Sequence, residues 1–135
     1  AAMRGLAASL GLTEERVRFT GYLPQKDLWQ ACLGCHMAII PQQPGVAYFS
    51  PIKFTESLAL GLPLIITPLP VFAQRSHLAQ VAEDCSPQGI AAAIGALAAS
   101  PEKAEALRNQ GLAASGEGTW QARARRIMDF AASLA

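Results

Sequence analysis

Continuous apolar runs and amphipathic stretches alternate along the chain. Apolar runs that end at proline or glycine are typical of strands buried on both faces of a parallel sheet, and apolar residues three or four positions apart are typical of helices. The predicted strands span residues 17–24, 37–41, 62–68 and 77–82. The predicted helices span residues 1–10, 25–34 and 50–61, and further helices fill 87–134. This alternation predicts one α/β domain over residues 1–135, an open parallel Rossmann-like sheet with helices on both faces.

The helix predicted over residues 50–61 has clear start and stop signals. Ser50 suits the N-cap, Pro51 suits the first helical position, and Gly61 suits the residue just past the end. The same serine-then-proline start recurs at Ser86–Pro87 and Ser100–Pro101. These signals fix where the helices begin more firmly than the apolar periodicity does.

The last segment, residues 120–134, is predicted to be an amphipathic helix. Its apolar positions are Trp120, Ala124, Ile127, Ala131 and Leu134. Arginines 123, 125 and 126 are the only basic cluster in a chain whose net charge is +1. That overall balance gives no electrostatic argument for nucleic acid or for an anionic membrane.

The bulk composition indicates a folded, soluble chain. Hydrophobic residues make up 51% and charged residues 16%, so disorder is excluded. No apolar run approaches the roughly 20 residues that span a bilayer, and the start lacks the apolar core of a signal peptide. Three cysteines do not form a disulfide framework, and we therefore expect a cytoplasmic setting.

Cys32, Cys35 and His36 have the C-x-x-C-H spacing that attaches a c-type haem. The short helix and strand around them leave no room for a haem. A thioredoxin-like pair prefers a helix N-terminus, whereas this pair falls at the end of a predicted helix. The interpretation we favour is that both cysteines fill the core.

A possible anion site lies where the helix over residues 50–61 begins. The backbone N–H groups of Ile52, Lys53 and Phe54 lack partners within the helix, and Lys53 adds a positive charge. Glu56 follows one turn later, and its side chain can lean back toward the helix start. These groups suit a ligand with a phosphate and vicinal hydroxyls. The alternative is an ordinary surface ion pair between Lys53 and Glu56.

From about Val17 to Leu134 the chain resembles the C-terminal half of a retaining GT-B glycosyltransferase of group 1. The most specific resemblance is SPIKFTESLALGLPLIIT, which matches the family's Pro-x-Lys-x-x-Glu helix, Gly-x-Pro turn and following strand. VRFTGYLPQKDLWQAC, CHMAIIP and SPQGIAAAIGALAASPEKAEALRNQG match neighbouring elements in the family's order. The resemblance implies a domain that binds a nucleotide-diphosphate sugar as donor, with no metal and no other cofactor.

The resemblance also implies roles for individual residues. Glu56 would accept hydrogen bonds from the ribose, and Lys53 with the backbone of Ser50, Pro51 and Ile52 would lie near the diphosphate or donor sugar. The turn formed by Gly21, Tyr22 and Leu23 would lie beside the base. Tyr48 occupies the position of a second glutamate that faces the donor sugar in many members, so the sugar contact is changed here.

The resemblance covers an incomplete domain. Two strands that the family places between 17–20 and 37–40 are missing. The family's arginine and lysine that neutralise the diphosphate are missing with them. The family's N-terminal acceptor domain is missing as well. The strand at 37–40 would then have an unpaired apolar edge, which proteins rarely leave open. We therefore expect a truncated chain, inactive alone, that pairs with the missing domain or with a second copy. Alternatively, segment 17–20 closes the gap.

The residues leave two other functions open. A non-catalytic α/β interaction module that keeps the scaffold is the main alternative, and the missing basic pair favours it. A nucleotide-sugar epimerase is less favoured, because His36 and His77 are not placed to line its cleft.

Overall fold

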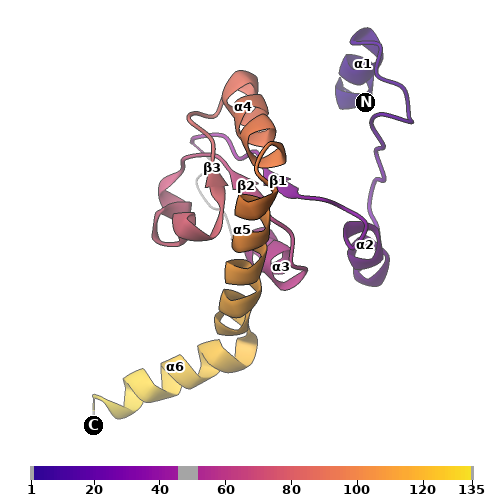
Figure 1. Ribbon diagram of the computed structural model, residues 1–135. Coiled ribbons are helices and arrows are strands. Elements are labelled where there is room, and N and C mark those ends of the chain that lie inside the picture. Colours follow the sequence, from indigo (N-terminus) through magenta and orange to yellow (C-terminus); the bar gives the residue numbers. More distant parts are fainter. Residues whose placement is uncertain (1, 46–51, 135) are drawn as a thin grey trace. The chain divides into compact units, whose positions relative to one another are not determined.

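The computed structural model describes residues 2–45 and 52–134. The chain forms two compact units, Ala1–Cys32 and Leu33–Ala135, and each is described by itself. Figure 1 shows the elements of both units. That the two units make up one domain, as the alternation of strands and helices predicts, stays a prediction.

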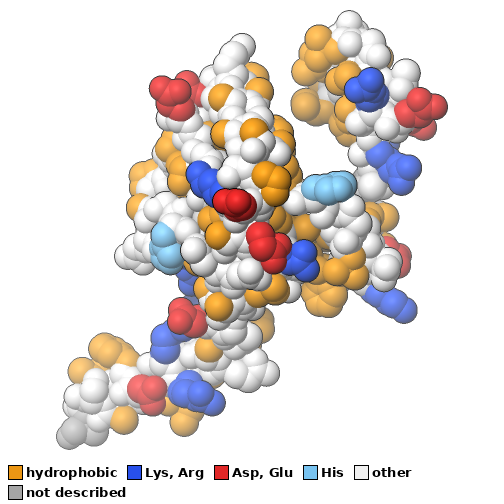
Figure 2. Space-filling view, in the orientation of Figure 1, with side chains coloured by type: hydrophobic (Ala, Val, Ile, Leu, Met, Phe, Trp, Pro, Cys, Tyr) orange, Lys and Arg blue, Asp and Glu red, His pale blue; other side chains and the backbone are white. Residues whose placement is uncertain are grey.

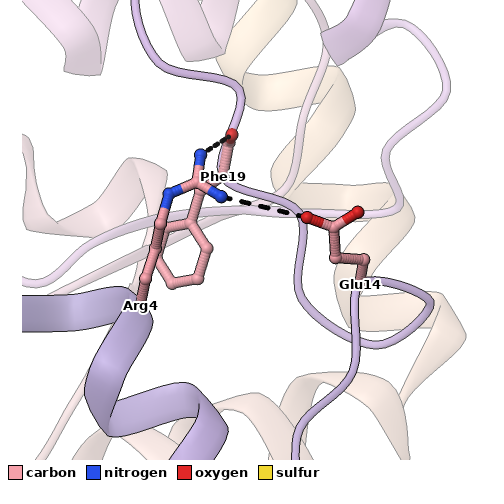
Figure 3. A network of polar contacts seen from close by, with 3 residues as sticks. All are labelled: Arg4, Glu14 and Phe19. Atoms are coloured by element: carbon pink, nitrogen blue, oxygen red, sulfur yellow. Dashed lines mark hydrogen bonds and ion pairs between the residues drawn. The ribbon is translucent and has the colours of Figure 1, made fainter. Parts of the chain in front are cut away.

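The first unit contains α1 (Ala2–Ser9) and α2 (Gln25–Cys32). Gly11, two residues past α1, has a φ of 68°, a conformation that favours glycine and ends the helix as predicted. The Arg4 side chain ties α1 to the segment that follows (Figure 3). Its Nη2 donates to the Phe19 carbonyl at 2.8 Å, its guanidinium lies 5.2 Å from the centre of the Phe19 ring, and Nη1 is 3.9 Å from Glu14 Oε1.

The strand predicted over residues 17–24 is wrong, because these residues form no strand in the structure. Val17 and Phe19 are half-buried while Arg18 and Thr20 are exposed, so the alternation that suggested a strand is present. A strand also needs a neighbour for its backbone groups, and the Phe19 carbonyl pairs with the Arg4 side chain instead. The alternative in which Val17–Thr20 joins the sheet as a strand is not seen within the described residues.

The second unit is built on a three-stranded parallel sheet. Its strands are β1 (Ala38–Ile40), β2 (Leu64–Ile66) and β3 (Gln80–Val81), in the order β1-β2-β3. Ile39 faces Ile65 in the register of β1 and β2. Strands are confirmed within the predicted ranges 37–41 and 62–68. Of the range 77–82 only Gln80–Val81 is a strand, because residues 77 and 78 end a 3₁₀ segment.

One face of the sheet packs on α3 (Ile52–Ala59) and on the 3₁₀ segment η1 (Pro70–Leu78). Leu64 and Ile66 point to this face, where they meet Phe54 and Leu58 of α3. The ring of Phe54 stacks on Phe72 of η1, with 5.7 Å between the ring centres. Gly61, with a φ of 65°, ends α3 and turns the chain toward β2.

The opposite face packs on α4 (Pro87–Ala98) and α5 (Pro101–Ser115). Ile65 of β2 points to this side, where it joins Leu97 and Leu107. Because β2 is buried on both faces, the predicted fold class, an open parallel sheet covered on both sides, is confirmed.

Helix α5 links the two layers. Leu107 packs in the cluster with α4, whereas Gly111 lies against Leu58 of α3, where a Cβ would come within 2.9 Å of the leucine side chain. The chain continues through η2 (Gly116–Gly118) into α6 (Trp120–Ala132), so the helices predicted within 87–134 are confirmed. Within the described ranges, no helix has the length and apolarity needed to cross a bilayer.

The start of α4 is held by a short chain of hydrogen bonds. Ser86, the N-cap, accepts from the Gly89 N–H at 3.0 Å, and its own hydroxyl donates to Asp84 Oδ1 at 2.5 Å. Gly89 is buried directly against that carboxylate. The missing side chain at position 89 therefore leaves the space that Asp84 occupies.

We expect Gly89→Ala and Gly95→Ala, two changes in the same helix, to have opposite effects. A Cβ at position 89 would collide with Asp84 and disrupt the cap, lowering the free energy of unfolding by about 1–2 kcal/mol. A Cβ at position 95 meets nothing within 4 Å, so the gain in helix propensity should raise that free energy by about 0.5–1 kcal/mol. Urea unfolding followed by circular dichroism measures both, and equal shifts in one direction would contradict the expectation.

Candidate functional site

The three parallel strands end together at one edge of the sheet, which we call the carboxyl edge. It is formed by the residues that follow β1, β2 and β3, and by the start of α3. In open α/β sheets, ligands bind beyond this edge because the loops and helix N-termini there leave polar backbone groups exposed. It is therefore the first place to look for a functional site.

Two hydrogen bonds join the segments that leave the three strands. The Thr67 hydroxyl, at the end of β2, donates to the Gln42 carbonyl at 2.7 Å, and Thr67 is almost fully buried. The Gln43 side-chain amide donates to the Cys85 carbonyl at 3.1 Å, which links the chain after β1 to the chain after β3. The carboxyl edge thus has a fixed backbone frame.

A hollow of about 410 Å³ opens at the ends of β2 and β3. Ile66, Phe72 and Val81 line it with apolar surface, and Thr67 and Ser76 provide hydroxyl groups. Pro68, Leu69, Pro70 and Ala73 complete its wall. Since none of these residues is charged, the hollow suits an uncharged ring or sugar better than a phosphate.

The start of α3 lies at the same edge, because α3 follows β1 and leads back to β2. Ile52 is 58% exposed and Lys53 is exposed, whereas Phe54 is buried in the core. Glu56 is half-buried. Within residues 2–45 and 52–134, Lys53 and Glu56 form no ion pair, so the alternative of a simple surface pair between them is not seen.

The start of α3 therefore places a positive charge and a carboxylate on one element at the carboxyl edge. A helix start attracts anions through its N–H groups and its dipole. A carboxylate accepts hydrogen bonds from hydroxyl groups.

A family model described as "Glycosyl transferases group 1" matches residues 2–113, which is more than half of the chain. This chain belongs to the group 1 glycosyltransferases. The resemblance seen in the sequence is confirmed at this level. No curated protein matches the chain, and no solved structure matches it.

Several predicted site residues of this glycosyltransferase chain lie outside the described residues. They are Tyr48, Ser50 and Pro51, and the predicted N-cap at Ser50 falls with them. Of the residues expected near the diphosphate, the structure describes Ile52 and Lys53, and both are exposed. Their proposed contacts stay predictions.

The predicted base-contacting turn belongs to the first unit of the glycosyltransferase chain. Gly21 has a φ of 67°, which suits a tight turn, and Leu23 is half-buried. Tyr22 is 93% exposed and presents its whole ring. Because Glu56 lies in the other unit, a shared site for these residues stays a prediction.

The cysteines are not the buried core residues that the sequence suggested. Cys32, the last residue of α2, is half-buried, and Cys35 is exposed. Both lie at or beyond the C-terminal end of α2, where the helix dipole does not favour a thiolate. The described residues contain no group of histidine, cysteine and acidic side chains that could hold a metal.

The apolar pattern does not predict the polar residues that frame the carboxyl edge of this glycosyltransferase. Gln42, Gln43 and Thr67 directly follow apolar strand runs, and that position was the available signal. Asp84 follows β3 in the same way. The Ser86 hydroxyl and, with a smaller effect, the Ser86 N–H donate hydrogen bonds to Asp84. These bonds hold the pKa of Asp84 below its usual value, so this carboxylate stays charged.

Removing the hydroxyl of Thr67 should loosen the carboxyl edge. In Thr67→Val the Gln42 carbonyl loses its buried donor, a change that typically costs about 1–3 kcal/mol. We expect faster hydrogen exchange in residues 42–45, measured by mass spectrometry. Thr67→Ser keeps the hydroxyl and is the matched control, and equal exchange in both variants would contradict this role for the bond.

Proposed function

We propose that this chain is the donor-binding part of a group 1 glycosyltransferase and that the start of α3 contacts a nucleotide-diphosphate sugar. The observation that carries the proposal is the exposed Lys53 and the half-buried Glu56 on a helix that begins at the carboxyl edge of the sheet. Neither side chain is paired with the other, so both can meet a ligand.

The diphosphate is best suited to the first turn of α3. The first N–H groups of a helix have no partner within the helix, and the dipole makes that end positive. Lys53 adds a full charge beside it. This arrangement partly replaces the basic pair that the family carries on an earlier strand.

Glu56 is the proposed ligand of the ribose. A carboxylate can accept from both hydroxyls of a vicinal diol, and such charge-assisted hydrogen bonds are about twice as strong as neutral ones. Helical side chains lean toward the helix N-terminus, which brings the carboxylate toward the first turn. The carboxylate and the helix start would then hold neighbouring parts of one nucleotide.

The uncharged parts of the donor have two proposed places. The hollow at the ends of β2 and β3 has apolar walls and two hydroxyl groups, which suits the base or the sugar. The turn of Gly21, Tyr22 and Leu23 is the family's place for the base. The proposal requires no metal and no cofactor beyond the donor, and it assigns catalysis to the complete enzyme.

Titration calorimetry with UDP and GDP tests the proposal. We expect binding at submillimolar to millimolar concentration, because only part of the cleft is available. Glu56→Gln should weaken binding about 10–100-fold, the loss of one charged hydrogen-bonding group. Glu102→Gln, an equal change at an exposed position of α5, is the matched control.

If neither nucleotide binds at millimolar concentration, donor binding by this chain is wrong, and the alternative of a non-catalytic interaction module is favoured. If Glu56→Gln and Glu102→Gln bind equally well, Glu56 is not the ribose ligand.

We also propose that the edge of β1 pairs with a further strand, supplied by the rest of the enzyme or by a second copy. Within the described residues, β1 pairs with β2 alone. Ala38 donates its N–H to the Pro63 carbonyl, so the backbone groups of Ile39 point to the other side. Ile39 is also 40% exposed, and open apolar edges tend to be covered.

We expect the isolated chain to be a dimer at high concentration when measured by size-exclusion chromatography with light scattering. Ile39→Lys should shift it toward monomer, because a charge on an edge strand opposes further pairing. Ile52→Lys, a change at a still more exposed isoleucine, should leave the dimer intact. A monomer for the unmodified chain at high concentration would contradict self-pairing.

A further inference from the structure

The hollow of about 410 Å³ at the ends of β2 and β3 has no charged residue in its wall. Charged side chains of both signs are scattered over the visible helices (Figure 2), so the uncharged wall is a local feature. Ile66, Phe72 and Val81 supply apolar surface. The hydrogen bonds already made by the few polar groups of the wall therefore decide what the hollow can hold.

Both hydroxyl groups of the hollow have already given their proton to the protein. Thr67 Oγ1 donates to the Gln42 carbonyl at 2.7 Å, and Ser76 Oγ donates to the Ala73 carbonyl at 3.0 Å. A hydroxyl group has one proton and two lone pairs, so a hydroxyl whose proton is committed can only accept from a ligand. Thr67 is almost fully buried, whereas Ser76 is half-buried. Ser76 is therefore the hydroxyl that a ligand can reach, and it would act as an acceptor.

The loop residues 68–70, which close the hollow, offer no free N–H. Pro68 and Pro70 have no backbone N–H. The N–H of Leu69, between them, donates to the Thr67 carbonyl at 2.8 Å, and the N–H of Phe72 donates to the Leu69 carbonyl at 3.0 Å. A carbonyl oxygen keeps a second lone pair after one such bond. At these positions the wall thus presents acceptors and no donors.

An acceptor wall with apolar surroundings favours a ring that donates hydrogen bonds. A diphosphate does not fit, because its oxygens are acceptors and its charge would lose hydration without meeting a cation. Guanine fits, because its N1–H and its exocyclic amino group are adjacent donors on one edge. Uracil has a single N–H between two carbonyl groups, so in the hollow its acceptors would face other acceptors and stay unsatisfied.

We infer that the hollow holds a guanine base, which makes the donor a guanosine-diphosphate sugar. This inference rests on the proposed donor-binding function and adds the identity of the base. It places the base at the ends of β2 and β3 and not at the turn of Gly21, Tyr22 and Leu23. The diphosphate stays at the start of α3. Because β1 leads to α3 and neighbouring strands lie about 4.8 Å apart, the hollow and the start of α3 belong to neighbouring strands of one edge.

Calorimetric titration of the unmodified chain with GDP, inosine diphosphate and UDP tests the inference. Inosine diphosphate keeps a purine ring and its N1–H but lacks the exocyclic amino group of guanine. We expect GDP to bind about tenfold more tightly than inosine diphosphate, the effect of one lost hydrogen bond, and more tightly still than UDP. An affinity for either of the other two nucleotides that equals or exceeds the affinity for GDP overturns guanine recognition.

A variant of Ser76 tests the hollow itself. Ser76→Ala should weaken GDP binding about tenfold and leave UDP binding within about twofold, because only the guanine donors use this acceptor. Ser115→Ala is the matched control, because the Ser115 hydroxyl makes the same kind of bond, to the Leu112 carbonyl at 2.8 Å, from a half-buried position of α5. If Ser76→Ala and Ser115→Ala bind GDP equally well, the hollow is not the base site.

Hydrogen exchange measured by mass spectrometry locates the base without a substitution. GDP should slow exchange in residues 69–81, which surround the hollow. Protection confined to residues 20–24 would place the base at the family's turn and overturn the inference.

The same titrations separate the inference from the proposal on which it rests. If neither GDP nor UDP binds at millimolar concentration, the donor-binding proposal is wrong and the inference is wrong with it. If both bind without a preference for GDP, donor binding stands and only the assignment of the base is wrong.

Discussion

Burial of β2 on both faces is the constraint on which the rest of the second unit depends. Leu64, Ile65 and Ile66 are almost fully inaccessible, and their side chains point alternately to the two helical layers. An apolar strand of this kind is stable only if helices cover both sides. The covering helices must then start or end at the edges of the sheet, and α3 consequently begins at the carboxyl edge.

The same constraint explains why the candidate site is rigid on one side. Thr67 follows directly after β2 and is buried like the strand. Because a buried hydroxyl needs a hydrogen-bond partner, it donates to the Gln42 carbonyl. The backbone after β1 is therefore tied to the backbone after β2. A ligand at this edge would meet a fixed frame, with Lys53 and Glu56 on the adjoining helix.

The periphery follows a different principle. The edge of β1 and the apolar side chains of α6 are exposed, so neither is stabilised by the unit that carries it. Both are explained most simply if the chain works against another surface.

Sequence alone determined the strands of the second unit, the helices and the family. Apolar runs, N-capping serines and the Lys-x-x-Glu helix are local signals, and local signals suffice for elements whose pattern matches their burial. Only the tertiary structure showed that Val17–Thr20, which has the alternation of a strand, forms no strand. It likewise revealed Thr67 and Gln42 as partners and left the apolar side chains of α6 uncovered. Pairing and burial depend on what lies opposite a residue in space, and a linear pattern does not contain that neighbour.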